Sequence, residues 1–298
     1  MIDAGITGGE TIIAGELLEV LINHPDVSIK WVCSAERQGL VMNCHKGLIG
    51  ECDLMFSEPD FDDVDVVFSC DENSARMCAK AAEYDKELRV IDLSGAINAK
   101  DNFMYGLCEI NRKFMVHDCY GVIDLPSPQA MAALLPLIPL AKLLMLNGDI
   151  GVTLCTGALV PDIAVETLKK EMLTVLTVLQ TSFASKIDIT VEKSDVSRCV
   201  SAEITLPCKI DVDEVKRLVV DYYSDHNFTY VTGQDVTAHD VVNTNKCLIT
   251  IRREEENLRM TSVIDGMLKG SAGNAVHVMN LLFGLHEKVG LMLKAQRY

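Results

Sequence analysis

A glycine turn near the N-terminus is the part of this chain best suited to hold a charged ligand. Gly8 and Gly9 follow the apolar run of residues 2–7, and Gly15 lies within the amphipathic segment that continues to residue 22. A strand, a glycine turn and a helix in this order form the loop that holds the diphosphate of a dinucleotide against a helix N-terminus. The expected contact residues of this loop are Gly8, Gly9, Glu10, Thr11 and Ile12.

The tip of this turn carries a charge that opposes such a ligand. Glu10 and Thr11 stand where glycines are usual in a diphosphate loop. The Glu10 carboxylate would face the phosphates of the ligand, and an uncompensated like charge weakens binding. The turn therefore has the shape of a dinucleotide loop and the wrong charge for one.

A second set of polar residues follows the next expected strand, at residues 34–37. A carboxylate at this place binds the ribose hydroxyls of NAD, whereas a small hydroxyl with a nearby arginine suits the 2′-phosphate of NADP. Ser34 and Arg37 match the second pattern. They are either determinants of NADP binding or ordinary polar residues of a solvated loop, and the sequence leaves both interpretations open.

Catalysis by a thiol needs a partner that handles protons. The chain has eleven cysteines and seven histidines, with no CxxC pair and no His/Cys cluster at zinc-ligand spacing. His117 and Cys119 could share one face of a strand, although structural roles are favoured for both. Neither Cys119 nor Cys108 is expected at a helix N-terminus, where a thiol's pKa falls. His277 is expected as a polar surface residue of the last helix.

Alternating apolar runs and helical patterns position these residues. The runs at residues 29–33, 65–69 and 89–93 are typical of central parallel strands covered on both faces. The second half mixes strand-like and helical segments. We therefore expect an α/β protein with a Rossmann-like doubly wound parallel sheet and a second α+β domain. The expected domains are an NAD(P)-binding domain at 1–149, on which a C-terminal helix at 274–298 packs, and a substrate or dimerisation-like domain at 150–273.

Composition excludes some classes of function. The net charge of −16 argues against a nucleic-acid partner, because phosphate contacts require a basic face. The longest apolar stretch, residues 131–146, contains Pro136, Pro139 and Lys142 and is shorter than the roughly 20 residues of a membrane span. It is expected to form a buried core helix. No basic segment precedes an apolar run at the N-terminus, and the cysteines are scattered, so a reducing cytoplasm is predicted.

Four stretches together resemble one family: residues 8–17, 105–112, 242–246 and 268–276. The chain resembles N-acetyl-gamma-glutamyl-phosphate reductase, which is related to aspartate-semialdehyde dehydrogenase. The resemblance implies NADP as cofactor, with Gly273 among its contacts, and self-association through the second domain. It also implies a step of arginine biosynthesis, in which a cysteine attacks an acyl phosphate, a histidine acts as acid and base, and NADPH reduces the thioester to an aldehyde.

The chain departs from that family at the positions that carry the chemistry. Aligned back from residues 137–142, the family's Asn-Pro-Gly-Cys turn falls on residues 125–128, which puts Pro128 at the nucleophile's position. The segment that holds the family's histidine is missing, and its two histidine positions fall on Gly157 and Leu159. Ile97 stands where the family has an arginine.

Three interpretations remain open. The chain is a folded but degenerate member of the family, inactive in acyl-phosphate reduction and paired with itself or with an active paralogue. Alternatively, it is an active NADP-dependent reductase with a rearranged site, in which Cys119 or Cys108 serves as nucleophile. The third possibility is a non-catalytic subunit that binds a nucleotide or a small acidic metabolite through Ser34, Arg37 and the turn at 269–273.

Overall fold

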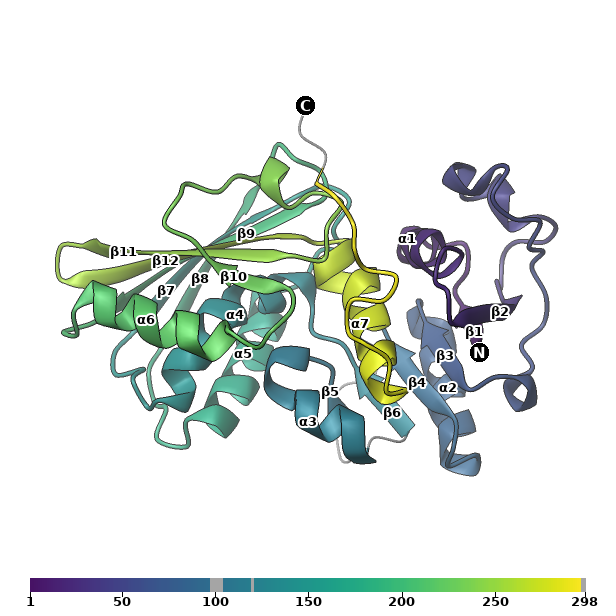
Figure 1. Cartoon of the computed structure of the whole chain (residues 1–298), viewed down its shortest axis with the longest axis horizontal. Coiled ribbons are helices and arrows are strands. Elements are labelled where there is room, and N and C mark those ends of the chain that lie inside the picture. The colour runs from purple at the N-terminus through teal and green to yellow at the C-terminus, as the bar shows by residue number, and fades with distance from the viewer. Residues whose placement is uncertain (97–103, 119–120, 296–298) are drawn as a thin grey trace. The chain divides into compact units, whose positions relative to one another are not determined.

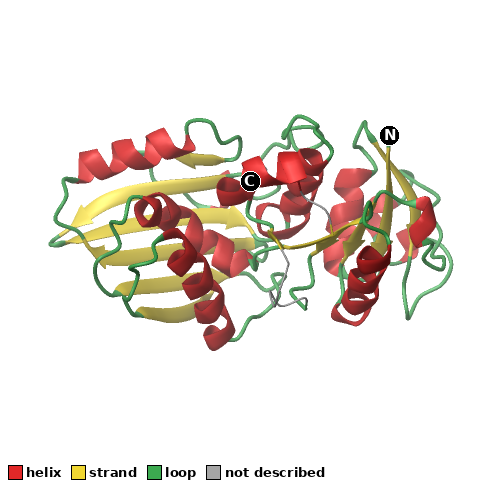
Figure 2. Ribbon diagram, turned by 90° about the horizontal axis from the view of Figure 1, so that it is seen from below, coloured by secondary structure: helices red, strands yellow, loops and turns green. Residues whose placement is uncertain are grey.

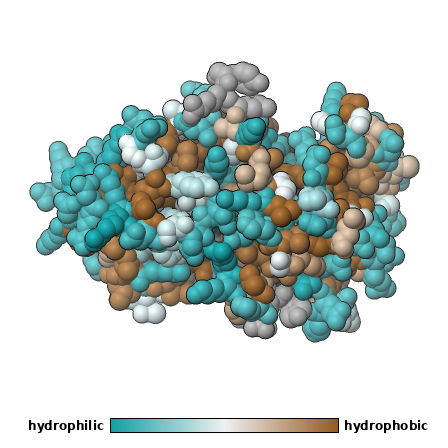
Figure 3. Space-filling view, in the orientation of Figure 1, coloured by the Kyte–Doolittle hydropathy of each residue, from teal (hydrophilic) through white to brown (hydrophobic). Residues whose placement is uncertain are grey.

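The computed structural model describes residues 1–96, 104–118 and 121–295 (Figures 1 and 2). These residues form two compact units. Unit 1 contains residues 1–126 and 271–292, and unit 2 contains residues 127–270 with the short stretch that follows residue 292. Hydrophilic side chains cover much of the face shown in Figure 3. Within the described ranges, no helix is long and apolar enough to cross a membrane.

Unit 1 is a doubly wound parallel sheet in the order β2-β1-β3-β4-β6-β5, which confirms the expected fold class. Helix α2 covers one face through a cluster that includes Trp31, Val67 and Cys78, while α1 and α7 pack against each other. Strand β3 is buried throughout, as its continuous apolar run predicts. The strands are β1 Ile2–Thr7, β2 Val27–Val32, β3 Val66–Ser69, β4 Arg89–Asp92, β5 Met104–Tyr105 and β6 Gly121–Asp124. The helices are α1 Ile12–Leu21, α2 Glu72–Tyr84, α3 Cys108–Asp118 and α7 Gly273–Leu282, with 3-10 turns at Val41–Asn43, Lys46–Leu48 and Phe61–Asp63.

Unit 2 is a mixed sheet in the order β10-β11-β12-β9-β7-β8, covered by a layer of helices. Helix α4 packs on β9 and β12, with α5 beside it over β8 and α6 beside it over β10 and β11 (Figure 1). The strands are β7 Ile150–Thr156, β8 Ile187–Lys193, β9 Cys199–Pro207, β10 Thr229–Val231, β11 Cys247–Glu254 and β12 Asn257–Asp265. The helices are α4 Pro128–Lys142, α5 Val165–Leu179 and α6 Val212–Tyr223, with a 3-10 turn at Ala238–Asp240. A π-helical turn at Leu268–Ala272 precedes α7.

The boundary between the units lies at residue 126, earlier than the expected residue 149, because α4 belongs to unit 2. Residues 129–141 are all buried, and two long-range hydrogen bonds tie α4 to its own unit. Pro136 and Pro139 lack the N–H groups that would bond the carbonyls of Ala132 and Leu135. Ser262 Oγ donates to Ala132 O at 2.5 Å, and Tyr223 Oη donates to Leu135 O at 2.5 Å. Unit 2 thus supplies the donors that the prolines remove.

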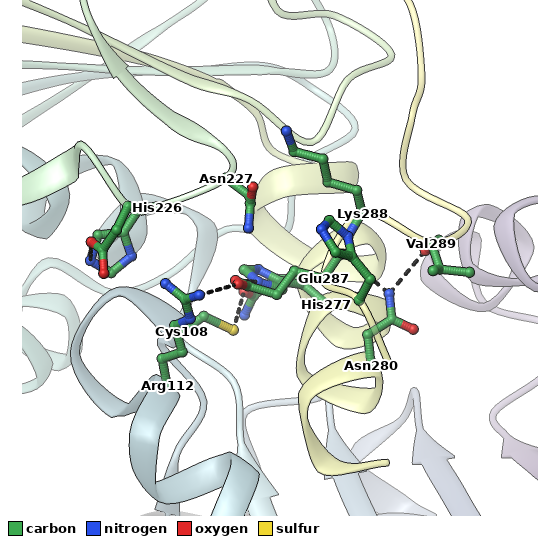
Figure 4. Close-up of polar contacts among 12 residues, drawn as sticks. Cys108, Arg112, His226, Asn227, His277, Asn280, Glu287, Lys288 and Val289 are labelled. Atoms are coloured by element: carbon green, nitrogen blue, oxygen red, sulfur yellow. Dashed lines mark hydrogen bonds and ion pairs between the residues drawn. The ribbon is translucent and has the colours of Figure 1, made fainter. Parts of the chain in front are cut away.

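The last helix is also shorter than expected. Helix α7 ends at Leu282, and residues 283–295 contain no further helix. This segment passes His24, since a Cβ on Gly290 would lie 2.4 Å from His24 Cδ2. Asn280 holds this segment, since its Nδ2 donates to Glu287 O at 3.2 Å and to Val289 O at 2.9 Å (Figure 4). His24 Nε2 lies 3.0 Å from Asn280 Oδ1. The carbonyls of Glu287 and Val289 are therefore bonded by the Asn280 side chain, and not by the backbone N–H groups of the longer helix that the sequence predicts.

Candidate functional site

The glycine turn between β1 and α1 is held in shape by the chain's own packing. Gly8 has φ of +63°, and a Cβ there would lie 2.7 Å from Asp71 Cβ. A Cβ on Gly9 would lie 2.4 Å from Val32 Cγ1, and one on Gly15 would lie 2.5 Å from His45 Nδ1. Thr11 caps α1, with its Oγ1 accepting from Ala14 N at 3.1 Å. These contacts require the glycines whether or not a ligand binds.

Glu10 lies at the carboxyl edge of the parallel sheet, where doubly wound folds bind their ligands. Its side chain is half-buried, and its Oε2 is enclosed with no hydrogen-bond partner among the described residues. Burial, followed by the charges of Glu58 and Glu10, raises the pKa of the Cys33 thiol at the end of β2. Burial and several carboxylates, Glu10 among them, also raise the pKa of Cys70 after β3. The edge that would receive a diphosphate is therefore acidic.

Ser34 and Arg37 lie in the loop after β2, where the sequence places them. Ser34 Oγ accepts from Glu36 N at 3.1 Å and from Arg37 N at 2.9 Å, so the hydroxyl organises its own loop. The side chain of Arg37 is exposed. Gly273 begins α7, the helix that packs against α1. All the residues expected to hold a cofactor thus belong to unit 1.

Pro128 occupies the first position of α4, and the residues around it belong to unit 2. Ser127 is the N-cap, and its Oγ accepts from Ala130 N at 3.2 Å. The Glu171 carboxylate, from α5, accepts from Ser127 N at 3.0 Å and from Ser127 Oγ at 2.7 Å. A Cβ on Gly270 would lie 2.7 Å from Pro128 Cβ, so the proline ring packs directly on that backbone. The start of this helix is partly exposed, and a carboxylate of the same unit is bonded to it.

The short connection from β7 to α5 is ordered by main-chain bonds. Gly157 N donates to Cys199 O at 2.8 Å, and Leu159 N donates to Ser197 O at 2.9 Å. Gln129 Nε2, in the first turn of α4, donates to Pro161 O at 2.8 Å. The resemblance places the family's two histidine positions at Gly157 and Leu159, whose side chains cannot transfer a proton.

The expectation that His117 lies on a strand, where it would share a face with Cys119, is wrong for His117. His117 is an exposed residue in the last turn of α3, which continues to Asp118. Cys119 lies outside the described residues, as does Ile97.

Two further expectations need correction. Cys108 is the first residue of α3, so it does lie at a helix N-terminus; it is buried, and its Sγ lies 3.9 Å from Asn274 Oδ1. His277 is buried rather than on the surface. His277 Nε2 lies 2.7 Å from Glu287 Oε2, and Arg112 Nη2 lies 2.9 Å from Glu287 Oε1 (Figure 4). This network joins α3, α7 and the C-terminal segment that follows α7.

Glu171 is the residue of this site that sequence reasoning missed. It lies 44 positions from Ser127, within an ordinary amphipathic helix, and no local pattern marks it. No group of three or more His, Cys, Asp or Glu side chains arranged to hold a metal ion occurs in the part of the chain that the structure describes.

Comparison with known proteins places the chain in a class and then in a family. Residues 3–117 match the family model described as semialdehyde dehydrogenase, NAD binding domain. The fold agrees with aspartate semialdehyde dehydrogenase II of Vibrio cholerae complexed with ASA (TM-score 0.75, 15% identity, covering 95% of this chain and 98% of that one). It also agrees with aspartate semialdehyde dehydrogenase with NADP from Candida albicans (TM-score 0.72, 16% identity, 95% and 98%).

The curated relatives narrow this class to one family. The N-acetyl-gamma-glutamyl-phosphate reductases of Phocaeicola vulgatus and Parabacteroides distasonis are 36% and 35% identical to this chain, over the full length of both proteins in each pair. The chain belongs to the N-acetyl-gamma-glutamyl-phosphate reductase family. The first alignment extends over 333 positions, against 298 residues here, so that relative has residues that this chain lacks.

Proposed function

We propose that this chain is a non-catalytic member of its family that does not reduce acyl phosphates. The observation that carries the proposal is the start of α4, where Pro128 takes the position on which the family's nucleophile falls and Glu171 binds the N-cap residue. Covalent reduction of an acyl phosphate needs a thiolate and a proton-transfer group. Proline supplies no nucleophile, and Gly157 and Leu159 supply no imidazole.

NADP fits the residues of unit 1 in part. Ser34 and Arg37 suit a 2′-phosphate, and Gly8 keeps the left-handed conformation of a diphosphate loop. Glu10 opposes the diphosphate, because its enclosed Oε2 has no hydrogen-bond donor among the described residues. When bound, NADPH supplies hydride. We propose that this chain binds NADPH weakly.

The test is an NADPH-consumption assay with N-acetyl-glutamyl phosphate. The Phocaeicola vulgatus relative, assayed in parallel, is the positive control. We expect no turnover by this chain above the background without protein. Turnover would overturn the proposal. If that turnover disappeared in Cys108→Ser or Cys119→Ser, the rearranged-site interpretation would replace it.

A second candidate function is the binding of a small acidic metabolite. Asn245 is 1% exposed, and neither its Nδ2 nor its Oδ1 has a hydrogen-bond partner among the described residues. Leaving such an amide unsatisfied costs about 1–3 kcal/mol, so a polar ligand would be stabilised there. Lys269 belongs to the same unit and is fully buried, with Nζ 6.0 Å from the centre of the Phe228 ring. Calorimetric titration with N-acetylglutamate tests this function, and Asn245→Ala should abolish the heat of binding.

A non-catalytic subunit acts through a partner, and we propose self-association or pairing with an active paralogue. The face of the unit 2 sheet opposite α4 to α6 carries Thr153, Glu203 and Thr261 in register across three strands. Arg259 bonds Glu203 on this face. Light scattering after gel filtration measures self-association, and co-purification with a tagged active relative measures pairing. This part of the proposal would be contradicted by a protein that remains monomeric on its own and does not co-purify with the active relative.

A further inference from the structure

The N-terminus of α4 is occupied by a carboxylate of the same unit. Ser127 directs both its N–H and its hydroxyl hydrogen at Glu171, at 3.0 and 2.7 Å. Pro128 has no N–H, and the N–H of Ala130 is taken by Ser127 Oγ. An anion at this end of a helix is stabilised by the partial positive charge of the free N–H groups. Glu171 therefore occupies the position that an anionic ligand of this helix would take.

The position of Glu171 follows from the way in which α5 packs against α4. Leu168, Met172, Val175 and Leu176 are the buried side chains of α5, which packs against α4. Glu171 precedes Met172 and lies one turn after Leu168, at the border of the buried face. Helix α5 begins nine residues after β7 ends, and the bond from Gln129 to Pro161 O fixes this connection on α4. The short connection and the buried face together direct Glu171 toward Ser127.

We propose that Glu171 is a built-in autoinhibitory anion, which keeps the start of α4 from activating a thiol or holding a substrate anion. The inference deepens the proposed function, on which it rests, because it makes inactivity depend on a second residue besides Pro128. A thiol at position 128 would directly follow Ser127, whose N–H and hydroxyl bind the Glu171 carboxylate. A negative charge near a thiol opposes the thiolate that a helix N-terminus otherwise favours. Restoring cysteine at position 128 is thus insufficient while Glu171 is charged.

The test compares thiol reactivity in Pro128→Cys and in Pro128→Cys/Glu171→Gln. Alkylation by iodoacetamide at pH 7 is followed by mass spectrometry after cleavage on the N-terminal side of aspartate. The peptide of residues 124–148 then contains this thiol and none of the eleven native cysteines. The double variant should react about threefold to tenfold faster, because removing the charge increases the thiolate fraction. Pro128→Cys/Glu166→Gln is the matched control, since Glu166 is an exposed carboxylate of the same helix, and its rate should equal that of Pro128→Cys.

A second measurement leaves Pro128 in place, in case the cysteine variants do not fold. Inorganic phosphate at 10 mM (about the level of a weak anion site) should raise the melting temperature of Glu171→Ala and leave the wild-type protein and Glu166→Ala unchanged. Equal alkylation rates with and without Glu171, or no phosphate effect in Glu171→Ala, would overturn the inference. Turnover by the wild-type protein would instead overturn the proposed function, so the two failures are distinguishable.

Discussion

Two carboxylates lie near the starts of two helices in this molecule, and their surroundings differ. Glu171 in unit 2 accepts two hydrogen bonds from the N-cap of α4. Glu10 in unit 1 lies next to Thr11, the N-cap of α1, and its Oε2 is enclosed without a hydrogen-bond partner in the described ranges. Both positions belong to places where helix N–H groups could bind a ligand's anion.

The difference shows two ways in which a carboxylate can lie at the start of a helix. Around α4 the carboxylate is bonded to the N-cap residue, and Pro128 packs on Gly270. Around α1 the turn keeps the shape of a ligand site, and one uncompensated charge opposes the ligand. Glu171 is thus bonded to the helix start that it faces, whereas Glu10 Oε2 has no such bond among the described residues.

Glu171→Ala should give the largest effect on stability. It removes two charge-assisted hydrogen bonds from the N-cap of α4, a loss of about 2–3 kcal/mol in the free energy of unfolding. Urea unfolding followed by circular dichroism measures it. Glu166→Ala on the exposed face of the same helix should change stability by less than about 0.5 kcal/mol. Equal midpoints for the two variants would show that Glu171 is not structural, and the contrast with Glu10 would disappear.

Gly15→Ala tests whether the glycines of the α1 turn serve packing. The new Cβ would lie 2.5 Å from His45 Nδ1, and His45 Nε2 is itself 2.6 Å from Gly9 O. Overpacking of this kind costs about 1–3 kcal/mol. Gly233→Ala is the control, because nothing lies within 4 Å of a Cβ there. If Gly15→Ala were as stable as the control, the turn would be kept for another reason than its own packing.

Glu10→Ala should raise the affinity for NADPH about tenfold, which corresponds to about 1.4 kcal/mol for the removal of one like charge. Fluorescence titration with NADPH measures the dissociation constant. The stability of the protein should be unchanged or slightly higher, since the enclosed oxygen has no partner to lose. Glu36→Ala, an exposed carboxylate in the Ser34 loop, is the control. An unchanged dissociation constant would mean that Glu10 does not determine cofactor binding.

Much of the fold could be predicted from sequence, because its signals are local. The apolar runs at residues 2–7, 65–69 and 89–93 mark three parallel strands, and the turn at Gly8 marks the first crossover. The sequence did not show that α4 belongs to unit 2. Its prolines need donors from Ser262 and Tyr223, which are over 80 positions away in sequence.

The sequence predicted where the candidate site residues lie along the fold, but it did not predict which side chains surround them. Sequence places Glu10, Ser34 and Pro128 where the structure has them. It could not show that Glu171 reaches Ser127, because that contact depends on how α5 packs on α4. His277 was misjudged for a similar reason: its partner Glu287 lies on a segment that returns beside α7 only in the folded chain. Contacts of this kind are set by tertiary packing, which leaves no periodic pattern.

His24 adds a third ionisable side chain to the comparison of Glu171 with Glu10. It is buried in unit 1 and has a hydrogen-bond partner, Asn280. Burial is the main cause that lowers its pKa from the ordinary value of 6.5, against the opposing hydrogen bond with Asn280. The unfolded chain therefore binds more protons than the folded chain between the two pKa values. Stability is fully present above pH 6.5 and is lost as the pH falls through the folded pKa.

His24→Gln should reduce this loss. Between pH 7 and pH 5, the wild-type protein should lose more stability than the variant, by less than about 1 kcal/mol. Urea midpoints at the two pH values measure the difference, and His117→Gln, at an exposed histidine of α3, should leave the pH dependence of the wild type intact. Parallel pH profiles for His24→Gln and the wild-type protein would mean that protonation of His24 is tolerated in the fold. Unit 1 would then tolerate a buried charge at little cost in stability. The Glu10 carboxylate would in that case weaken dinucleotide binding less than its enclosed position suggests.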